Sequence, residues 1–257
     1  MLKTNYFTKS ELEAYDRDGF ILVKNFFDAE KLKHVIKMVD ELIAMPDRVG
    51  FIWKFYEDLS SNGAGKILDR IENYTFLVDG WKGLIAEGEL RDRSSELFGE
   101  DAILFKDKIN FKYPGGRGFK PHQDMHGDWQ IYAEKFLTAS IALDRCTIEN
   151  GCLYVSAGDH KRGLFGKMWE PIPDELLKKE NIKWIPLEME AGDVAFFDAY
   201  TPHYSERNLS KIRRAMIHLT YNNKTAGDFY QKHLDDKRVN YPPDIERKEG
   251  KSYVYRV

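Results

Sequence analysis

The chain has 257 residues, of which 42% are hydrophobic and 32% are charged, and its formal net charge is −3. Its dispersed basic residues argue against a nucleic-acid partner, and no apolar run is long enough to span a bilayer. Residues 1–6 lack the apolar core of a secretory signal, and the two cysteines suit a reducing compartment. We therefore expect a cytoplasmic protein without a membrane or nucleic-acid partner.

The first signals along the chain are those of a helix followed by a strand. Residues 8–18 have apolar side chains at helical spacing, with Thr8 at the N-cap and Glu11 three residues later, which is a capping-box pattern. The apolar run at residues 20–23 predicts a short buried strand.

A second amphipathic helix is expected over residues 28–44. Asp28 supplies its N-cap, and apolar residues recur at every third or fourth position. Residues 51–99 show a mixed pattern that we interpret as mostly helical. Residues 1–100 are therefore expected to form a mainly helical layer around a β core.

From residue 102 the pattern changes to that of strands. Short apolar or alternating runs, separated by turns, occur at residues 102–113, 136–143, 151–155, 184–189, 194–197 and 214–221. Such strands indicate a sandwich or barrel, so the fold class is mainly β with flanking helices. We expect one domain, with the β core at residues 101–222 and a tail at 223–257 that packs on it.

Four residues on predicted strand ends carry the main chemical signal. His122 and Asp124 are two residues apart, a spacing that puts both side chains on one face of a strand. Such a pair alone is common on protein surfaces, but His203 and Arg214 follow after buried strands. Two imidazoles and one carboxylate form the facial triad of non-haem iron oxygenases, which leaves positions for a 2-oxo acid and O₂. An arginine is suited to bind the far carboxylate of that acid, and only one of Arg213 and Arg214 can face the site.

Several further motifs occur in a fixed order between residues 9 and 221. They are Asp18-Gly19-Phe20, His122-Gln123-Asp124, Glu149-Asn150-Gly151-Cys152-Leu153, Gly158-Asp159-His160, Gly192-Asp193, and the stretch from His203 to Arg214. This ordered set resembles the phytanoyl-CoA dioxygenase family of Fe(II)- and 2-oxoglutarate-dependent oxygenases. The resemblance implies a double-stranded β-helix, or jelly-roll, core.

The resemblance also implies roles for individual residues. Three of them are expected to bind Fe(II) and to form the catalytic centre: His122, Asp124 and His203. The C5 carboxylate of 2-oxoglutarate is expected to contact Arg214 and Ser205, with Lys112 as a further co-substrate contact. An enzyme of this kind consumes O₂ and releases succinate and CO₂. Because related halogenases replace the carboxylate ligand with a small residue, Asp124 favours hydroxylation.

The substrate is expected to be small and polar: an amino acid, an amine or an alkylphosphonate. Residues 241–251 are similar to the tails of small-molecule members of the family, including hydroxylases of 2-aminoethylphosphonate-type compounds, although an extended tail packed on the core would look the same. Candidate substrate contacts are Trp129, His126, Trp53, Tyr56 and Lys120, whose ordinary alternative is core packing or a solvated surface. We expect a monomer or a homodimer.

Two other functions would use the same His-Asp-His set. One is a metal-dependent hydrolase, because zinc also binds two histidines and a carboxylate. The other is a cupin-type dioxygenase that does not use 2-oxoglutarate. A hydrolase would have no use for Arg214 and Ser205 beside the metal site. A metal-free binding module would not need all three ligands.

Overall fold

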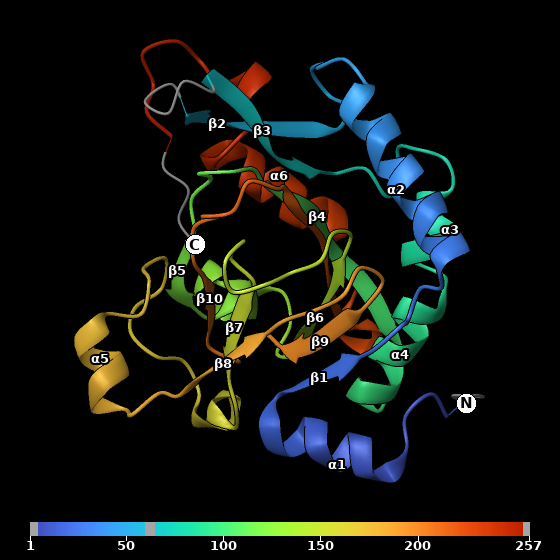
Figure 1. Ribbon diagram of the computed structural model, residues 1–257, viewed down its shortest axis with the longest axis vertical. Coiled ribbons are helices and arrows are strands. Elements are labelled where there is room, and N and C mark those ends of the chain that lie inside the picture. The colour runs from blue at the N-terminus through green and yellow to red at the C-terminus, as the bar shows by residue number, and fades with distance from the viewer. Residues whose placement is uncertain (1–4, 60–64, 254–257) are drawn as a thin grey trace.

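The computed structural model describes residues 5–59 and 65–253, which contain two antiparallel β-sheets. In Figure 1, α2 (Ala29–Ala44), α3 (Trp81–Ile85) and α4 (Glu89–Phe98) lie along one side of the molecule, and α5 (Asp174–Lys179) lies on the other. The larger sheet has the order β1 (Phe20–Val23), β9 (Val194–Asp198), β6 (Phe136–Ala142), β11 (Arg214–Asn223), β4 (Ala102–Lys112), β3 (Gly65–Glu72) and β2 (Trp53–Leu59). The smaller sheet has the order β5 (Phe119–His122), β10 (His203–Ser205), β7 (Leu153–Ser156) and β8 (Trp184–Leu187).

The strands from β4 to β11 form a double-stranded β-helix. Within the larger sheet they are ordered β9-β6-β11-β4, and in the smaller sheet β5-β10-β7-β8, so the chain passes repeatedly from one sheet to the other. Apolar side chains of both sheets pack between them, including Val155 and Leu187 from one sheet and Phe197 and Met216 from the other. This arrangement confirms the predicted jelly-roll core.

The two N-terminal helices form where the sequence predicts them. In α1 (Lys9–Asp18), the side chain of Thr8 accepts a hydrogen bond from the backbone of Glu11, whose carboxylate accepts one from the backbone of Thr8. Helix α2 (Ala29–Ala44) begins at Asp28, whose carboxylate accepts from the backbone of Lys31 at 2.8 Å. Its buried face packs on the outer side of the larger sheet.

Residues 51–99 differ from the expectation that they are mostly helical. Helices α3 (Trp81–Ile85) and α4 (Glu89–Phe98) are present, but β2 and β3 form a hairpin that extends the larger sheet. Strand β3 pairs with β4 almost forty positions later, where Ile71 lies opposite Ile109. Because this pairing is distant in sequence, the local pattern of residues 51–72 does not reveal it.

The C-terminal part packs against the larger sheet. Helix α6 (Tyr230–Asn240) contacts β4, and the short helix η6 (Asp244–Glu246) contacts β2. The remaining short helices are η2 (Asp124–Gly127), η3 (Trp129–Ile131), η4 (Asp159–Arg162), α5 (Asp174–Lys179) and η5 (Lys224–Ala226). Among the described residues, no helix has the length and apolar character needed to cross a bilayer.

Candidate active site

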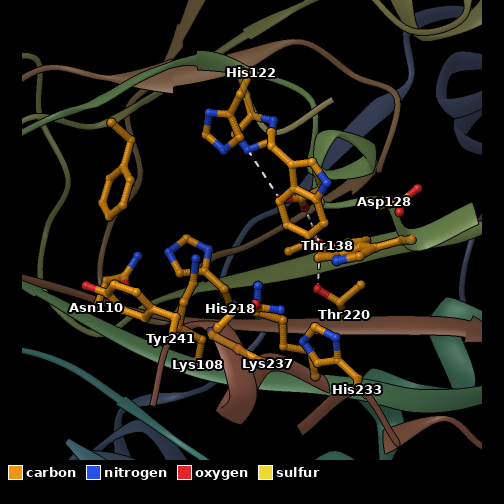
Figure 2. A pocket seen from close by; sticks show the side chains of 18 of the residues that line it. Lys108, Asn110, His122, Asp128, Thr138, His218, Thr220, His233, Lys237 and Tyr241 are labelled. Atoms are coloured by element: carbon orange, nitrogen blue, oxygen red, sulfur yellow. Dashed lines mark hydrogen bonds and ion pairs between the residues drawn. The ribbon is translucent and has the colours of Figure 1, made fainter. Parts of the chain in front are cut away.

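A cavity of about 770 Å³ opens between the two sheets. Its walls come from β4 and β11 of the larger sheet, β5 and β10 of the smaller sheet, the η2–η3 turn and α6. Figure 2 shows side chains from these elements converging on one space, with His122 on one wall and Lys108 and His218 on another. The size and the mixed polar and apolar walls suit a small ligand.

Three of the predicted site residues meet at this cavity. His122 ends β5 and His203 begins β10, where the two are direct partners across the sheet and their ring centroids are 4.2 Å apart. The Oδ1 atom of Asp124 lies 3.8 Å from Nε2 of His203. One ligand atom from each residue can be chosen so that all three atoms lie within 4.8 Å of one another. That spacing suits three ligands of one metal ion.

The two imidazoles are held so that their Nε2 atoms can bind a metal. Nδ1 of His122 donates to the carbonyl of Lys120 at 2.7 Å, and Nδ1 of His203 donates to the carbonyl of Thr201 at 3.0 Å. A carbonyl can only accept, so both Nδ1 atoms carry the proton and both Nε2 atoms keep a lone pair. Burial lowers the pKa of both histidines, which keeps them neutral.

The carboxylate of Asp124 is oriented by a chain of hydroxyl groups. Thr138 donates to Oδ2 of Asp124 at 2.9 Å, and the hydroxyl of Thr138 is itself 3.0 Å from that of Thr220. Burial opposes ionisation of Asp124, but His203 and Lys106 outweigh it and lower the pKa of the carboxyl below its usual value. An ionised carboxylate with Oδ1 directed toward His203 completes a donor set that fits a ferrous ion.

Asp124 does not lie in a strand, contrary to the expectation. It is the first residue of the 3₁₀ helix η2, and Gln123 before it is extended, with φ −115° and ψ 142°. The chain therefore turns directly after Gln123, and Asp124 still reaches the same metal position as His122. The buried amide of Gln123 fixes this turn, because it donates to the carbonyls of Gly163 and Tyr200 and accepts from the backbone of Phe165.

Arg214 lies at the end of the cavity formed by the first residues of β11. Its side chain is buried, and Nη2 donates to the carbonyl of Gly151 at 3.0 Å. Its Nε atom has no hydrogen-bond partner among the described residues. A buried donor of this kind fits a carboxylate ligand. Arg213 points the other way and pairs with Asp144 at 3.0 Å, as the alternation of a strand predicts.

Ser205 lines the cavity near Arg214, whereas Lys112 lies behind it. The ammonium group of Lys112 donates to the Ser205 hydroxyl at 2.8 Å and to the carbonyls of Glu206 and Gly151. In its protonated form the group has one proton for each of these three acceptors. Burial, and then the nearby Arg214, lower the pKa of Lys112 to about 6. Lys112 is therefore placed to orient Ser205, and it is not among the residues that line the cavity.

Of the five candidate substrate residues, only Trp129 lines the cavity. His126 is buried behind it and is bonded through both ring nitrogens, to the backbone of Gln123 at 2.9 Å and of Phe165 at 2.6 Å. The other three do not reach the cavity because Trp53 and Tyr56 lie on the edge strand β2 and Lys120 is exposed to solvent. The expectation that these four contact substrate therefore has no geometric support.

A row of polar residues on β4 was not predicted from the sequence. Lys106, Lys108 and Asn110 face the cavity, whereas Ile109 and Phe111 face the helical layer. The alternation of polar and apolar residues in this central strand was the available signal. This alternation does not distinguish a cavity wall from a solvent-exposed surface, because a polar face on such a strand is typical of both.

The two lysines of this row have no close polar partner in the described protein. Nζ of Lys108 lies 5.7 Å from the ring centroid of Phe119, and Nζ of Lys106 lies 5.0 Å from that of Trp129. Within the described part of the chain, neither lysine forms a hydrogen bond or an ion pair. Burial, and then the nearby Lys106, lower the pKa of Lys108 to about 7. A bound anion would stabilise the charged form of Lys108, which burial disfavours.

The known proteins that this chain resembles include dioxygenases and hydroxylases. The sequence pattern of the phytanoyl-CoA dioxygenase family matches residues 15–216. The chain is 35% identical over 252 residues to a 2-aminoethylphosphonate dioxygenase of an uncultured bacterium (HF130_AEPn_1), with 97% of this chain and 94% of the relative covered. It is 32% identical over 234 residues to a methylphosphonate hydroxylase of Gimesia maris, with 91% and 88% covered.

Solved structures agree with the fold. The structure of EctD from S. alaskensis with 2-oxoglutarate and 5-hydroxyectoine superposes with a TM-score of 0.73 at 23% identity. The match covers 87% of this chain and 79% of that chain. At this level of identity the likeness supports the jelly-roll architecture alone.

Proposed function

The chain belongs to the phytanoyl-CoA dioxygenase family, and from this premise we propose that it hydroxylates a small alkylphosphonate, with 2-aminoethylphosphonate as the leading candidate. The protein is an oxygenase that depends on Fe(II) and 2-oxoglutarate. The hydrolase alternative is not favoured, because the relatives that resemble the chain along most of its length are dioxygenases and hydroxylases.

We assign the metal site to three residues: His122, Asp124 and His203. The assignment is supported by two neutral imidazoles with free Nε2 atoms and by an ionised carboxylate fixed through Thr138. Bound Fe(II) supplies the oxidation by O₂, in which 2-oxoglutarate is converted to succinate and CO₂. The protein's part is to orient the ligands and to keep open positions on the cavity side.

We assign the C5 carboxylate of 2-oxoglutarate to Arg214 and Ser205. The unused Nε donor of Arg214 and the Ser205 hydroxyl both border the cavity. Lys112 fixes the position of Ser205 from behind, so that the two carboxylate contacts are arranged before the co-substrate binds. A charge-assisted bond to an arginine in a buried site is well suited to select a diacid over a monoacid.

The observation that carries the substrate assignment is the pair of cavity lysines without a hydrogen bond or ion pair, Lys106 and Lys108, beside the buried amide of Asn110. A phosphonate offers three oxygens and up to two negative charges, which would compensate both lysines and accept hydrogen bonds from Asn110. A simple amine has no group that could pair with these two lysines. The names of the phosphonate-acting relatives point to the same class of compound.

We further propose that the protein acts in the cytoplasm as a monomer or as a homodimer of independent subunits, within a single domain. All residues assigned to the metal and the co-substrate come from one chain, so a second copy is not needed to complete the site. Both cysteines, Cys146 and Cys152, are free and buried, which suits a reducing compartment.

The test is a substrate screen on the Fe(II)-loaded enzyme. Succinate formation is measured with 2-oxoglutarate and, in parallel, with 2-aminoethylphosphonate, methylphosphonate, ectoine and a set of amino acids. We expect a phosphonate to stimulate succinate formation about tenfold or more above the rate without substrate, and ³¹P NMR to show a new hydroxylated product. Stimulation by ectoine or an amino acid and by no phosphonate would contradict the proposal.

A further inference from the structure

One carboxylate in the cavity is not accounted for by the site described above. Three aspartates line the cavity: Asp124, Asp128 and Asp236. Asp124 belongs to the metal site, and Asp236 accepts from the hydroxyl of Tyr132 at 2.6 Å and from Lys232 at 2.7 Å. Asp128 is half-buried, and among the described residues its side chain has neither a hydrogen bond nor an ion pair. It is thus a negative charge directed into the cavity without a protein partner.

The position of Asp128 is fixed by its backbone. It lies between η2 and η3 with φ 59° and ψ 34°, in the left-handed region that residues other than glycine, asparagine and aspartate seldom adopt. Its N–H donates to the carbonyl of Met125 at 3.2 Å. The next residue, Trp129, is buried edge-to-face against Phe105, with ring centroids 5.2 Å apart. The backbone hydrogen bond to Met125 and the packed ring of Trp129 therefore fix the turn on both sides of Asp128, and the Asp128 side chain has a defined position.

Asp128 lies across the cavity from Lys108 and Asn110 (Figure 2), whereas Lys106 of the same strand reaches over the neighbouring Trp129 ring at 5.0 Å. Figure 2 shows the Asp128 carboxylate on one side of the view and Lys108 and Asn110 on the other. The ring of Trp129 follows directly in sequence, and the Asp128 carboxylate contributes to raising the pKa of the Tyr132 phenol, after burial and Asp236. The charge of the cavity is therefore divided: positive along β4, and negative at the η2–η3 turn beside two aromatic rings.

We propose that Asp128 binds the ammonium group of an aminoalkylphosphonate and so makes the enzyme prefer this class over alkylphosphonates without an amine. The inference rests on the proposed phosphonate function, which it makes more specific. A 2-aminoalkylphosphonate carries its two opposite charges two carbons apart, and the divided cavity offers a partner for each. The ammonium donates to Asp128. The Trp129 and Tyr132 rings already lie under Lys106 at 5.0 Å and Lys232 at 5.3 Å, so the Asp128 carboxylate is the group that attracts it.

The same arrangement would disfavour a phosphonate that lacks the amine. An alkylphosphonate without an amine would cover Asp128 and leave its charge with fewer water contacts and no partner. Sites built to bind a polar group discriminate against analogues that lack it, because the protein group is left unpaired. Lys106 does not replace the missing ammonium, because it forms no ion pair with Asp128 and lies over the Trp129 ring.

The experiment compares 2-aminoethylphosphonate with ethylphosphonate, which has the same carbon skeleton but no amine. We expect Asp128→Asn to raise KM for the aminated compound about tenfold or more, the loss of one charge-assisted contact. KM for ethylphosphonate, or its Ki as a competitor if it is not turned over, should stay level or fall, because the variant leaves no charge unpaired beside this ligand. Asparagine tolerates the left-handed backbone, so the turn should be retained. Iron content should match that of the wild type, which shows that the metal site is retained.

The matched control is Asp236→Asn, which removes a carboxylate of the same cavity that already has protein partners. Its KM for 2-aminoethylphosphonate should change less than twofold. An equal increase in both variants would overturn the inference, since general negative charge and not Asp128 would then attract the substrate. An unchanged KM in Asp128→Asn would also overturn it while leaving the phosphonate function intact. If no phosphonate stimulates the wild-type enzyme, the proposed function fails, and this inference fails with it.

Discussion

The two ends of the cavity satisfy their buried charges in different ways. At the Arg214 end, the protein itself supplies partners: Lys112 makes three hydrogen bonds, and Nη2 of Arg214 donates to the carbonyl of Gly151. At the β4 end, Lys106 and Lys108 form no hydrogen bond or ion pair with any described residue. The first end is thus preorganised for one ligand, whereas the second holds cations whose close polar contacts are left for a bound ligand. Changes at the first end should stop turnover with every substrate, and changes at the second should alter substrate choice.

The largest effect is expected at the metal site. Replacing His122, Asp124 or His203 with alanine removes one of three metal ligands and should lower 2-oxoglutarate turnover by about a thousandfold or more. The measurements are iron content of the purified protein and succinate formation with and without substrate. His34→Ala serves as the control, because His34 is exposed on α2 and should leave both quantities unchanged. A variant that kept normal iron content and turnover would show that its residue is not a ligand.

The next effect concerns the co-substrate. Arg214→Ala removes a charge-assisted contact in a buried place, which corresponds to roughly 2 to 4 kcal/mol, or about 30- to 800-fold in the KM for 2-oxoglutarate. Titration of succinate formation against 2-oxoglutarate measures it. Arg213→Ala is the matched control, because Arg213 pairs with Asp144 and points away from the cavity. A larger effect in Arg213→Ala would reverse the assignment of the two arginines.

A smaller and more selective effect is expected at the β4 end. Lys108→Met keeps the length of the side chain but removes its charge, and it should raise KM for the phosphonate about tenfold while KM for 2-oxoglutarate changes less than threefold. Lys183→Met, at an exposed position, is the control. Equal increases for both ligands would remove the distinction between the two ends.

These two ends also differ in how far the sequence predicts them. The metal and co-substrate residues lie in short motifs with fixed spacing, so the chain itself brings His122 and Asp124 together and separates Arg213 from Arg214. The jelly-roll core, the oxygenase function and the family were predicted from such ordered motifs and are confirmed. The individual roles of the site residues stay predictions until the variants above are measured.

The substrate end could not be predicted in the same way because it is assembled by pairing across the sheet. Lys108 lies opposite His218 on β11, and which face of β4 borders the cavity depends on packing against the helical layer. Four aromatic and polar candidates were instead chosen by their type, and Trp53 and Tyr56 lie on a strand that the local pattern did not reveal. Residue type indicated the chemistry but not the direction of the side chain.

The smallest expected effect is a pH dependence that belongs to the β4 end alone. The pKa of Lys108 is lowered to about 7, so the free enzyme loses this positive charge as the pH rises through 7. A bound phosphonate favours the charged form, so binding takes up a proton, and KM should rise with pH. From pH 6.5 to 8.0 the protonated fraction falls about eightfold, which sets the expected increase in KM for the phosphonate.

The comparison with Lys108→Arg separates this titration from that of the phosphonate itself. Arginine keeps its charge throughout the range, so the rise in KM should disappear in this variant, and any remaining slope belongs to the substrate. KM for 2-oxoglutarate should stay level over the same range in both proteins, because the Arg214 guanidinium remains charged. If KM for the phosphonate rose with pH equally in the wild type and in Lys108→Arg, Lys108 would stay charged near neutral pH. Groups of the protein, and not the substrate alone, would then stabilise the charge on β4.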